Sequence, residues 1–214
     1  MSSGKLIAIE GIDGSGKTDF TQALTQSLQQ AGIPTLSAFE PGGTDLAMRL
    51  RDILKSGQAG DDPWVQALLF NAARRSLLQT VVLPALQAGT WVILDRFLDS
   101  TLVYQSSPEC HAEELLQLHA LAQGNLQPHA KILLDVSPSI AMQRTAHRGD
   151  LDYFDNNTLE HYQTLRHRFW HLVETQNDNA WIVINADRPL VESLTETMQH
   201  LRWRFSELNQ PEIA

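Results

Sequence analysis

Residues 6–18 of this 214-residue chain read LIAIEGIDGSGKT, and this stretch decides the fold. Residues 6–9 are apolar, which predicts a short buried strand that leads into a glycine-rich turn. Residues 11–18 match the pattern G-x-x-x-x-G-K-[ST] of a phosphate-binding loop. Beyond the loop, apolar residues recur at helical spacing as far as Gly32. The order strand, loop, helix is the context in which this loop binds phosphate.

The residue types of the loop suit the binding of a nucleotide phosphate. Its glycines let backbone N–H groups converge on phosphate oxygens, and the start of a helix adds partial positive charge. We expect Lys17 to neutralise β- and γ-phosphate charge and the Thr18 hydroxyl to ligate Mg²⁺. The predicted nucleotide-binding residues are Gly11, Ile12, Asp13, Gly14, Ser15, Gly16, Lys17 and Thr18.

The remainder of the chain alternates short apolar runs with helical patterns. Strands are expected at residues 6–9, 35–39, 91–94, 132–136 and 181–184. Helical spacing predicts further helices near residues 46–54, 64–88 and 190–208. This alternation is typical of an α/β fold, a parallel sheet of about five strands flanked by helices, with ligands at the carboxyl ends of the strands. We expect a single domain over residues 1–214.

The charge balance argues against nucleic-acid and membrane partners. The chain carries 25 acidic against 16 basic residues, a net charge of -9, which disfavours non-specific binding to anionic polymers and surfaces. Its longest apolar runs are far shorter than the roughly 20 residues that span a bilayer. Cys110 is the only cysteine, and the first residues lack a signal-peptide pattern. These features predict a cytoplasmic protein.

Four motifs, in order and at matching spacing, resemble thymidylate kinases of the bacterial type. They are the loop at residues 11–18, EPGGT at 40–44, LFNAAR at 69–74 and DRFLDSTLVYQ at 95–105. Residues 148–152, RGDLD, resemble the start of the lid of that family, which would lie around residues 147–157. The resemblance implies the P-loop kinase fold and a homodimer. It also implies Mg²⁺-dependent transfer of the γ-phosphoryl group of ATP to dTMP.

The resemblance also assigns roles to individual residues. Lys17 and Arg96 would stabilise the transferring phosphates, and Thr18 and Asp95 would hold Mg²⁺. Arg144 and Arg148, at the mouth of the lid, are our further candidates for contacts with these phosphates. The implied acceptor-binding residues are Asp13, Glu40, Arg51, Phe70, Arg74, Arg96, Ser100, Thr101, Tyr104 and Gln105. Among them, Phe70 would stack on thymine, and Arg74 would hydrogen-bond a base carbonyl. Pro41 corresponds to a proline that is often cis in the family.

Several of these residues also have a purely structural interpretation. On pattern alone Phe70 suits a core position, and Asp13 suits a loop cap that bonds its own backbone. Asp95 and Arg96 suit a structural ion pair. The segment at residues 64–86 suits a dimer helix or a core helix equally.

Two positions depart from the family pattern, and both lack a positive charge. Phe39 and Tyr153 stand where many bacterial members carry arginine, and the second of these arginines approaches the transferred phosphoryl group. An arginine there contributes about 10³–10⁵ in rate, so we hypothesise that Arg144 or Arg148 takes over. Two alternatives follow: a kinase of the same fold for another acceptor such as dUMP, and a nucleotide-binding regulator that has lost turnover.

The segment at residues 147–161 is the most polar stretch inside the chain, and it suits a mobile flap or a solvated loop. His167 and His171 have the i, i+4 spacing that can hold zinc. No third ligand is evident in the sequence, so solvated helix histidines are the favoured interpretation.

Overall fold

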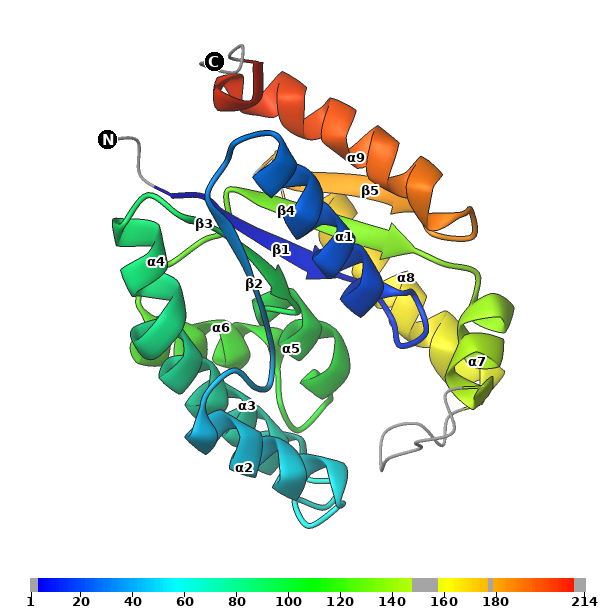
Figure 1. Cartoon of the computed structure of the whole chain (residues 1–214). Coiled ribbons are helices and arrows are strands. Elements are labelled where there is room, and N and C mark those ends of the chain that lie inside the picture. Colours follow the sequence, from blue (N-terminus) through cyan, green and yellow to red (C-terminus); the bar gives the residue numbers. More distant parts are fainter. Residues whose placement is uncertain (1–3, 148–157, 177–178, 210–214) are drawn as a thin grey trace.

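A computed structural model describes residues 4–147, 158–176 and 179–209 of the chain. Its centre is a five-stranded sheet in which every pair of neighbouring strands is parallel (Figure 1). The strands are β1 (Leu6–Glu10), β2 (Thr35–Phe39), β3 (Trp91–Asp95), β4 (Ala130–Asp135) and β5 (Trp181–Asn185). They lie in the order β2-β3-β1-β4-β5. The predicted α/β class and the number of strands are confirmed.

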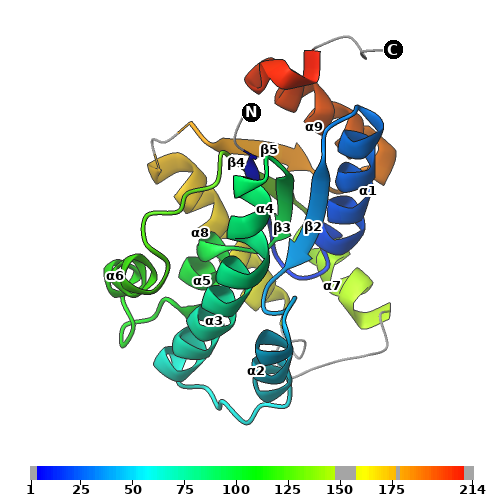
Figure 2. The same cartoon turned by 60° about the vertical axis from the view of Figure 1, so that its left-hand side comes forward.

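Helices cover both faces of this sheet. The first half of the chain supplies α1 (Lys17–Gln30), α2 (Asp45–Lys55), α3 (Pro63–Leu77), α4 (Leu83–Gln87) and α5 (Leu98–Gln105). The second half supplies α6 (Ala112–Gln123), α7 (Pro138–His147), α8 (Leu159–Thr175) and α9 (Leu190–Arg204), followed by a short 3₁₀ turn, Ser206–Asn209. Figure 2 shows α3, α4 and α6 on the side of the sheet away from α1 and α9.

The central strand explains why two layers of helix are needed. All five residues of β1 are buried. Ile7 and Ile9 belong to one core cluster, whereas Leu6 and Ala8 belong to another. Because successive side chains of a strand point to opposite faces, both faces of β1 must be covered by apolar partners. The only charged residue of the strand is Glu10, at its carboxyl end.

Local sequence signals fix where several helices begin. Thr44 caps α2 by accepting a hydrogen bond from the Ala47 N–H at 3.1 Å. Asp62 caps α3 in the same way, and Pro63 occupies the first helical position, where its missing N–H costs nothing. The Glu40–Pro41 peptide bond before α2, whose isomer the sequence left open, is cis.

The expected helix at residues 64–88 is present, with one difference. Between α3 and α4 a π-helical turn, Leu78–Val82, widens the helix. Pro84 follows and has no N–H to donate to the preceding turn, which is the physical reason for a local departure from α-helical bonding. β4 also begins two residues earlier than expected, because it includes the charged Lys131.

The single-domain assignment stays a prediction. The expected lid around residues 147–157 lies outside the described residues, apart from His147 at the end of α7.

Candidate functional site

The candidate site lies where adjacent strands end at the same edge of the sheet. The phosphate-binding loop follows β1, Asp95 ends the neighbouring strand β3, and Arg96 comes directly after it. On the other side of β1, β4 leads into α7 (Figure 1). The loop therefore lies between the segment that follows β3 and the segment that follows β4, at the carboxyl ends of the strands, where ligands of such sheets bind.

Lys17 is held over its own loop. Its Nζ donates to the carbonyl oxygens of Gly11, at 3.0 Å, and of Ile12, at 2.9 Å, and lies 3.5 Å from the Ser15 hydroxyl. Burial, followed by the nearby Arg96 charge, lowers the pKa of Lys17 to about 8. The ammonium is thus little solvated and is aimed along the loop, where a phosphate group would compensate its charge.

The loop glycines are required by its backbone and by its neighbours. Gly14 and Gly16 adopt φ values of 78° and 86°, in the left-handed region that favours glycine. A Cβ atom on Gly14 would lie 2.2 Å from the Ala141 carbonyl oxygen of α7. Helix α7 therefore packs directly onto the loop. The Ile12 side chain is buried in the core, so this residue faces the loop only through its backbone.

Thr18 and Asp95 form an oxygen pair beside the loop. The exposed Thr18 donates its hydroxyl hydrogen to Asp95 Oδ2 at 2.9 Å, which joins the start of α1 to the end of β3. A hydroxyl and a carboxylate are oxygen ligands of the kind that Mg²⁺ prefers, with phosphate and water completing its coordination. The donor set therefore fits this cation.

Arg96 links the end of β3 to the loop. Its Nη2 is paired with Asp13 Oδ1 at 2.5 Å, and its guanidinium lies 5.1 Å from the ring centre of Tyr104. Tyr104 donates its hydroxyl hydrogen to Asp13 Oδ2 at 2.9 Å. Burial, followed by the Asp13 charge, raises the pKa of Tyr104, so the hydroxyl stays a donor at neutral pH. Asp13 is paired with the Arg96 guanidinium, whereas Asp95 accepts a hydrogen bond from Thr18. The guanidinium and the oxygen atoms that suit Mg²⁺ therefore lie in separate parts of the site.

A buried glutamate, Glu10, supports this arrangement and was not anticipated from the sequence. Its carboxylate accepts hydrogen bonds from the Phe97 N–H at 2.9 Å and from the Ser100 hydroxyl at 2.6 Å. Burial, followed by the Asp99 charge, raises the pKa of Glu10 to about 7. The sequence did carry a signal, because Glu10 is a charged residue at the end of an apolar strand, directly before the loop.

Arg74 organises the part of the site under α5. Its Nε is paired with Glu40 Oε2 at 2.7 Å, and its Nη2 donates to the Phe97 carbonyl at 3.0 Å and the Thr101 hydroxyl at 2.9 Å. Arg74 is only 2% exposed. Among the described residues, none accepts a hydrogen bond from its Nη1, so one donor group remains for a ligand.

The other acceptor residues expected from the resemblance lie around α2, α3 and α5. Phe70 is half-buried and falls in neither core cluster of the described residues, which argues against the plain core interpretation. Arg51 donates to the Pro41 carbonyl at 3.1 Å and lies 5.5 Å from the ring centre of Phe39. Gln105 is buried, and its Nε2 donates to Gln66 Oε1 at 3.3 Å, so its amide bonds α3.

Arg144 faces a hollow next to the loop. Its Nη1 donates to the Ala186 carbonyl at 3.1 Å, beyond the end of β5. The hollow measures about 190 Å³, and its walls include Ser15, Gly16 and Arg188. Arg144 is therefore close to the loop, whereas Arg148 and Tyr153 lie outside the described residues.

A buried ion pair and a buried histidine were not predicted from the sequence. Lys131 on β4 is ion-paired with Asp99 on α5, with 3.3 Å between Nζ and Oδ2, and both side chains are buried. His119 is buried on α6, and among the described residues neither ring nitrogen has a hydrogen-bond partner. Burial, followed by the Arg74 charge, lowers the pKa of His119 to about 4. The only sequence signal for these buried groups was a single charged or polar residue within an otherwise apolar stretch.

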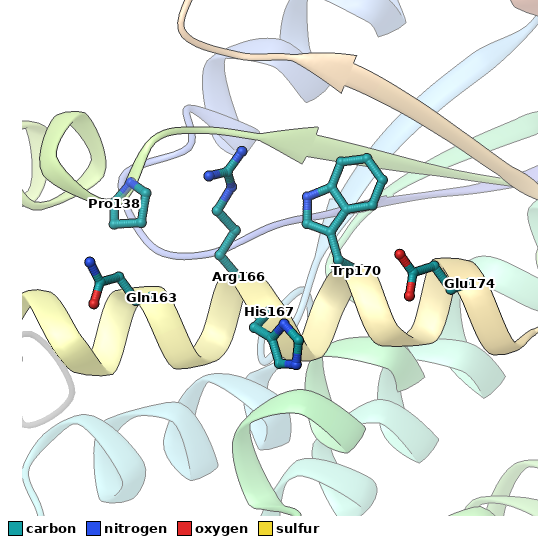
Figure 3. A pocket seen from close by; sticks show the side chains of 6 residues that line it. All are labelled: Pro138, Gln163, Arg166, His167, Trp170 and Glu174. Carbon is teal, nitrogen blue, oxygen red and sulfur yellow. The ribbon is translucent and has the colours of Figure 1, made fainter.

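A second hollow, of about 430 Å³, lies along α8 and shares no residue with the one beside the loop. Figure 3 shows Arg166 and Trp170 extending from α8 toward the strands, while His167 points another way. Arg166 is paired with Asp135 through both carboxylate oxygens, at 2.6 and 2.7 Å. In the described part of the chain, no three or more His, Cys, Asp or Glu side chains are grouped to hold a metal ion.

Comparison with known proteins decides the family. The family model described as thymidylate kinase matches residues 9–197. The chain belongs to the thymidylate kinase family. A thymidylate kinase of Magnetococcus marinus is 36% identical over 205 residues, which cover 94% of this chain and 97% of the relative. A thymidylate kinase of Legionella pneumophila is 35% identical over 214 residues, covering 98% of this chain and 100% of the relative.

A third relative, from Nitrosospira multiformis, is 39% identical over 167 residues and is also a thymidylate kinase; the match covers 78% of this chain and 82% of the relative. The parallel sheet, with the loop after β1, agrees with the P-loop kinase fold of the thymidylate kinase family. Across the described residues, no helix has the length and apolarity needed to cross a membrane.

Proposed function

We propose that this chain transfers the γ-phosphoryl group of ATP to dTMP, giving ADP and dTDP. The observation that carries the proposal is the contact between the two sides of the site. Arg96, at the end of β3, is ion-paired with Asp13 of the phosphate-binding loop. A phosphate held by Arg96 would therefore lie beside a phosphate held by the loop. Membership of the thymidylate kinase family supports dTMP as the acceptor.

In this proposal an oxygen of the dTMP phosphate attacks the γ-phosphorus, and the bond from the γ-phosphorus to the bridging oxygen of ADP breaks. The acceptor oxygen is already anionic near neutral pH, so no general base is required. Lys17 stabilises the β- and γ-phosphates, and Arg96 and Arg51 hold the acceptor phosphate. Positioning and charge stabilisation supply the rate.

The base and sugar would be held from the α3 and α5 side. Arg74 offers its remaining donor to a base carbonyl, and Phe70 offers a partly exposed ring for stacking. Thr101 is bonded to Arg74 and would orient it, while Asp13 and Tyr104 would contact the sugar. Glu40 acts through its ion pair with Arg74, and Ser100 through its bond to Arg96. Gln105 would complete the wall of the pocket.

Thr18 and Asp95 would hold Mg²⁺, which would neutralise charge on the donor phosphates. Arg144 lines the hollow beside the loop and would contact ATP there. Arg148 remains the second arginine proposed to replace the one absent at Tyr153. We also propose a cytoplasmic location, which suits the buried free thiol of Cys110.

The test is ADP release from ATP and Mg²⁺ with dTMP, dUMP, dCMP, UMP, AMP or GMP as the acceptor under identical conditions. We expect dTMP to give the largest kcat/KM. A larger value with dUMP would move the assignment to another pyrimidine kinase. Binding of dTMP without ADP release from any acceptor would contradict the kinase proposal and favour a nucleotide-binding regulator.

We propose that the protein is a homodimer that pairs through α3 and α6. These helices pack together (Figure 2). Both carry large exposed apolar side chains. They are Val65, Leu68, Leu116 and Leu121. Leu121 is 87% exposed in the single chain, and exposed apolar side chains on adjoining helices are typical of interaction surfaces.

Light scattering of the purified protein is expected to give twice the 24.0 kDa chain mass, and Leu68→Glu combined with Leu121→Glu to give the monomer mass. The matched control is Val191→Glu on α9, an apolar position whose exposure, 73%, lies between those of Leu68 and Leu121. A monomeric wild-type protein, or a dimer lost only in the α9 variant, would contradict the proposal.

A further inference from the structure

Glu10 joins the end of β1 to the start of α5. Its side chain is fully buried, and both carboxylate oxygens are used: Oε1 accepts from the Phe97 N–H, and Oε2 accepts from the Ser100 hydroxyl. Phe97 is the residue that precedes the first turn of α5. The first N–H groups of a helix have no partner within the helix, so an acceptor from another element fixes where the helix begins.

Arg96 lies between the two points that this contact holds together. Its φ is 70°, a left-handed conformation that is costly for a residue with a Cβ atom. On one side the Arg96 N–H donates to the Ile9 carbonyl at 2.9 Å, and on the other the Phe97 N–H donates to Glu10. The end of β1 therefore holds the Arg96 backbone in a conformation that it would not adopt unaided.

The side chain of Arg96 is oriented through the same carboxylate. Because the Ser100 hydroxyl gives its hydrogen to Glu10, its oxygen is free to accept from Arg96 Nη1, which lies 3.0 Å away. Glu10, Ser100 and Arg96 thus form a chain of hydrogen bonds that ends at the guanidinium facing Asp13. Glu10 itself is shielded from the site by this chain, since its own exposure is 0%.

We infer that Glu10 is a positioning residue for Arg96. It sets both the backbone and the guanidinium of the arginine that binds the acceptor phosphate, and it touches no substrate. The inference rests on the proposed function, in which Arg96 holds the phosphate of dTMP. It predicts that loss of Glu10 weakens dTMP binding only while Arg96 is present.

The experiment is calorimetric titration with dTMP of the wild-type chain, Glu10→Ala, Glu10→Gln, Arg96→Ala and the double variant Glu10→Ala/Arg96→Ala. We expect Glu10→Ala to weaken binding about tenfold, the loss that follows when a buried charged acceptor is removed. Glu10→Gln keeps the acceptor for Phe97 but reverses the bond to Ser100, so about a threefold loss is expected. In the Arg96→Ala background, Glu10→Ala is expected to change the affinity less than twofold.

Two further variants separate positioning from general damage to the fold. Asp99→Asn alters a buried carboxylate of the same helix that pairs with Lys131, and we expect its dTMP affinity to stay within twofold of wild type. Ser100→Ala interrupts the chain of hydrogen bonds and leaves the bond to Phe97 intact, so it tests the idea even if Glu10→Ala fails to fold. Its loss of affinity should also disappear in the Arg96→Ala background.

The inference fails if Glu10→Ala or Ser100→Ala weakens binding equally with and without Arg96, or if Glu10→Ala binds dTMP like the wild type. An equal loss in Asp99→Asn would also overturn it, because the effect would then belong to the helix as a whole. A wild-type chain that does not bind dTMP would instead overturn the proposed function, so the two failures are distinct.

Discussion

Lys17→Ala is expected to lower kcat by about 10²–10³-fold, because it removes a charge that the loop aims at the transferring phosphates. The ammonium is buried and is held by two loop carbonyls, so no neighbouring side chain can take its place without moving the loop. The measurement is the rate of ADP release at saturating ATP and dTMP.

The matched control for this variant is Lys5→Ala, which removes a lysine from the opposite end of β1, where it lies 3.6 Å from Glu207. We expect its kcat to equal that of the wild type within experimental error. Urea unfolding should show that both variants are folded at the assay temperature. A folded Lys17→Ala protein that keeps more than a tenth of the wild-type rate would exclude Lys17 from phosphoryl transfer.

Arg74→Ala is expected to have the largest effect on stability, a loss of about 3–5 kcal/mol in the free energy of unfolding. The change leaves the carboxylate of Glu40 buried without its cation, and it removes the donors to Thr101 and to the Phe97 carbonyl. Burial already raises the pKa of Glu40 to about 7 against the opposing attraction of Arg74. Urea unfolding at pH 8, above the pKa of about 7 that Glu40 has beside Arg74, measures the loss.

Arg75→Ala is the control, one residue further along α3. Arg75 is exposed and donates to the Ala122 carbonyl at 2.8 Å, so a change of about 0.5 kcal/mol is expected. The double variant Arg74→Met/Glu40→Leu removes both charges together and should be more stable than Arg74→Ala, since no unpaired carboxylate remains. If the double variant is less stable than the single one, the buried charge is not the cause.

The sequence was sufficient for the framework of the fold and for the centre of the site. Apolar runs located β1, β3, β4 and β5 because a parallel sheet buries both of its faces, and the loop pattern located the start of α1. The strand expected at residues 35–39 is β2, which is less apolar and only partly buried. The bounds were less certain where a polar residue belongs to a strand. Lys131 lies within β4, since Asp99 and Gln176 satisfy its ammonium there, and no local pattern reveals partners so distant in the chain.

Distance along the chain between partners also explains which supporting residues around the site were not predicted. The resemblance pointed to Arg96, Arg74 and Thr101 as separate ligand contacts, whereas the structure shows which protein groups hold them in place. Glu10 reaches residues 97 and 100, almost ninety positions away, and Glu40 reaches Arg74. Such pairs depend on the order of strands in the sheet, which a single sequence does not encode locally. The resemblance implied roles for individual residues but did not indicate the hydrogen bonds and ion pairs of Glu10 and Glu40 that hold those residues in place.

The absence of a side chain on Gly14 determines how closely α7 packs against the phosphate-binding loop. With only 2.2 Å between the place of a Cβ atom and the Ala141 carbonyl, the loop and α7 touch as two rigid surfaces without a compressible layer between them. A shift of α7 toward the loop would therefore require the loop backbone to move as well. Any larger residue at position 14 would force the loop and α7 apart, so glycine there is what allows the two to pack in direct contact.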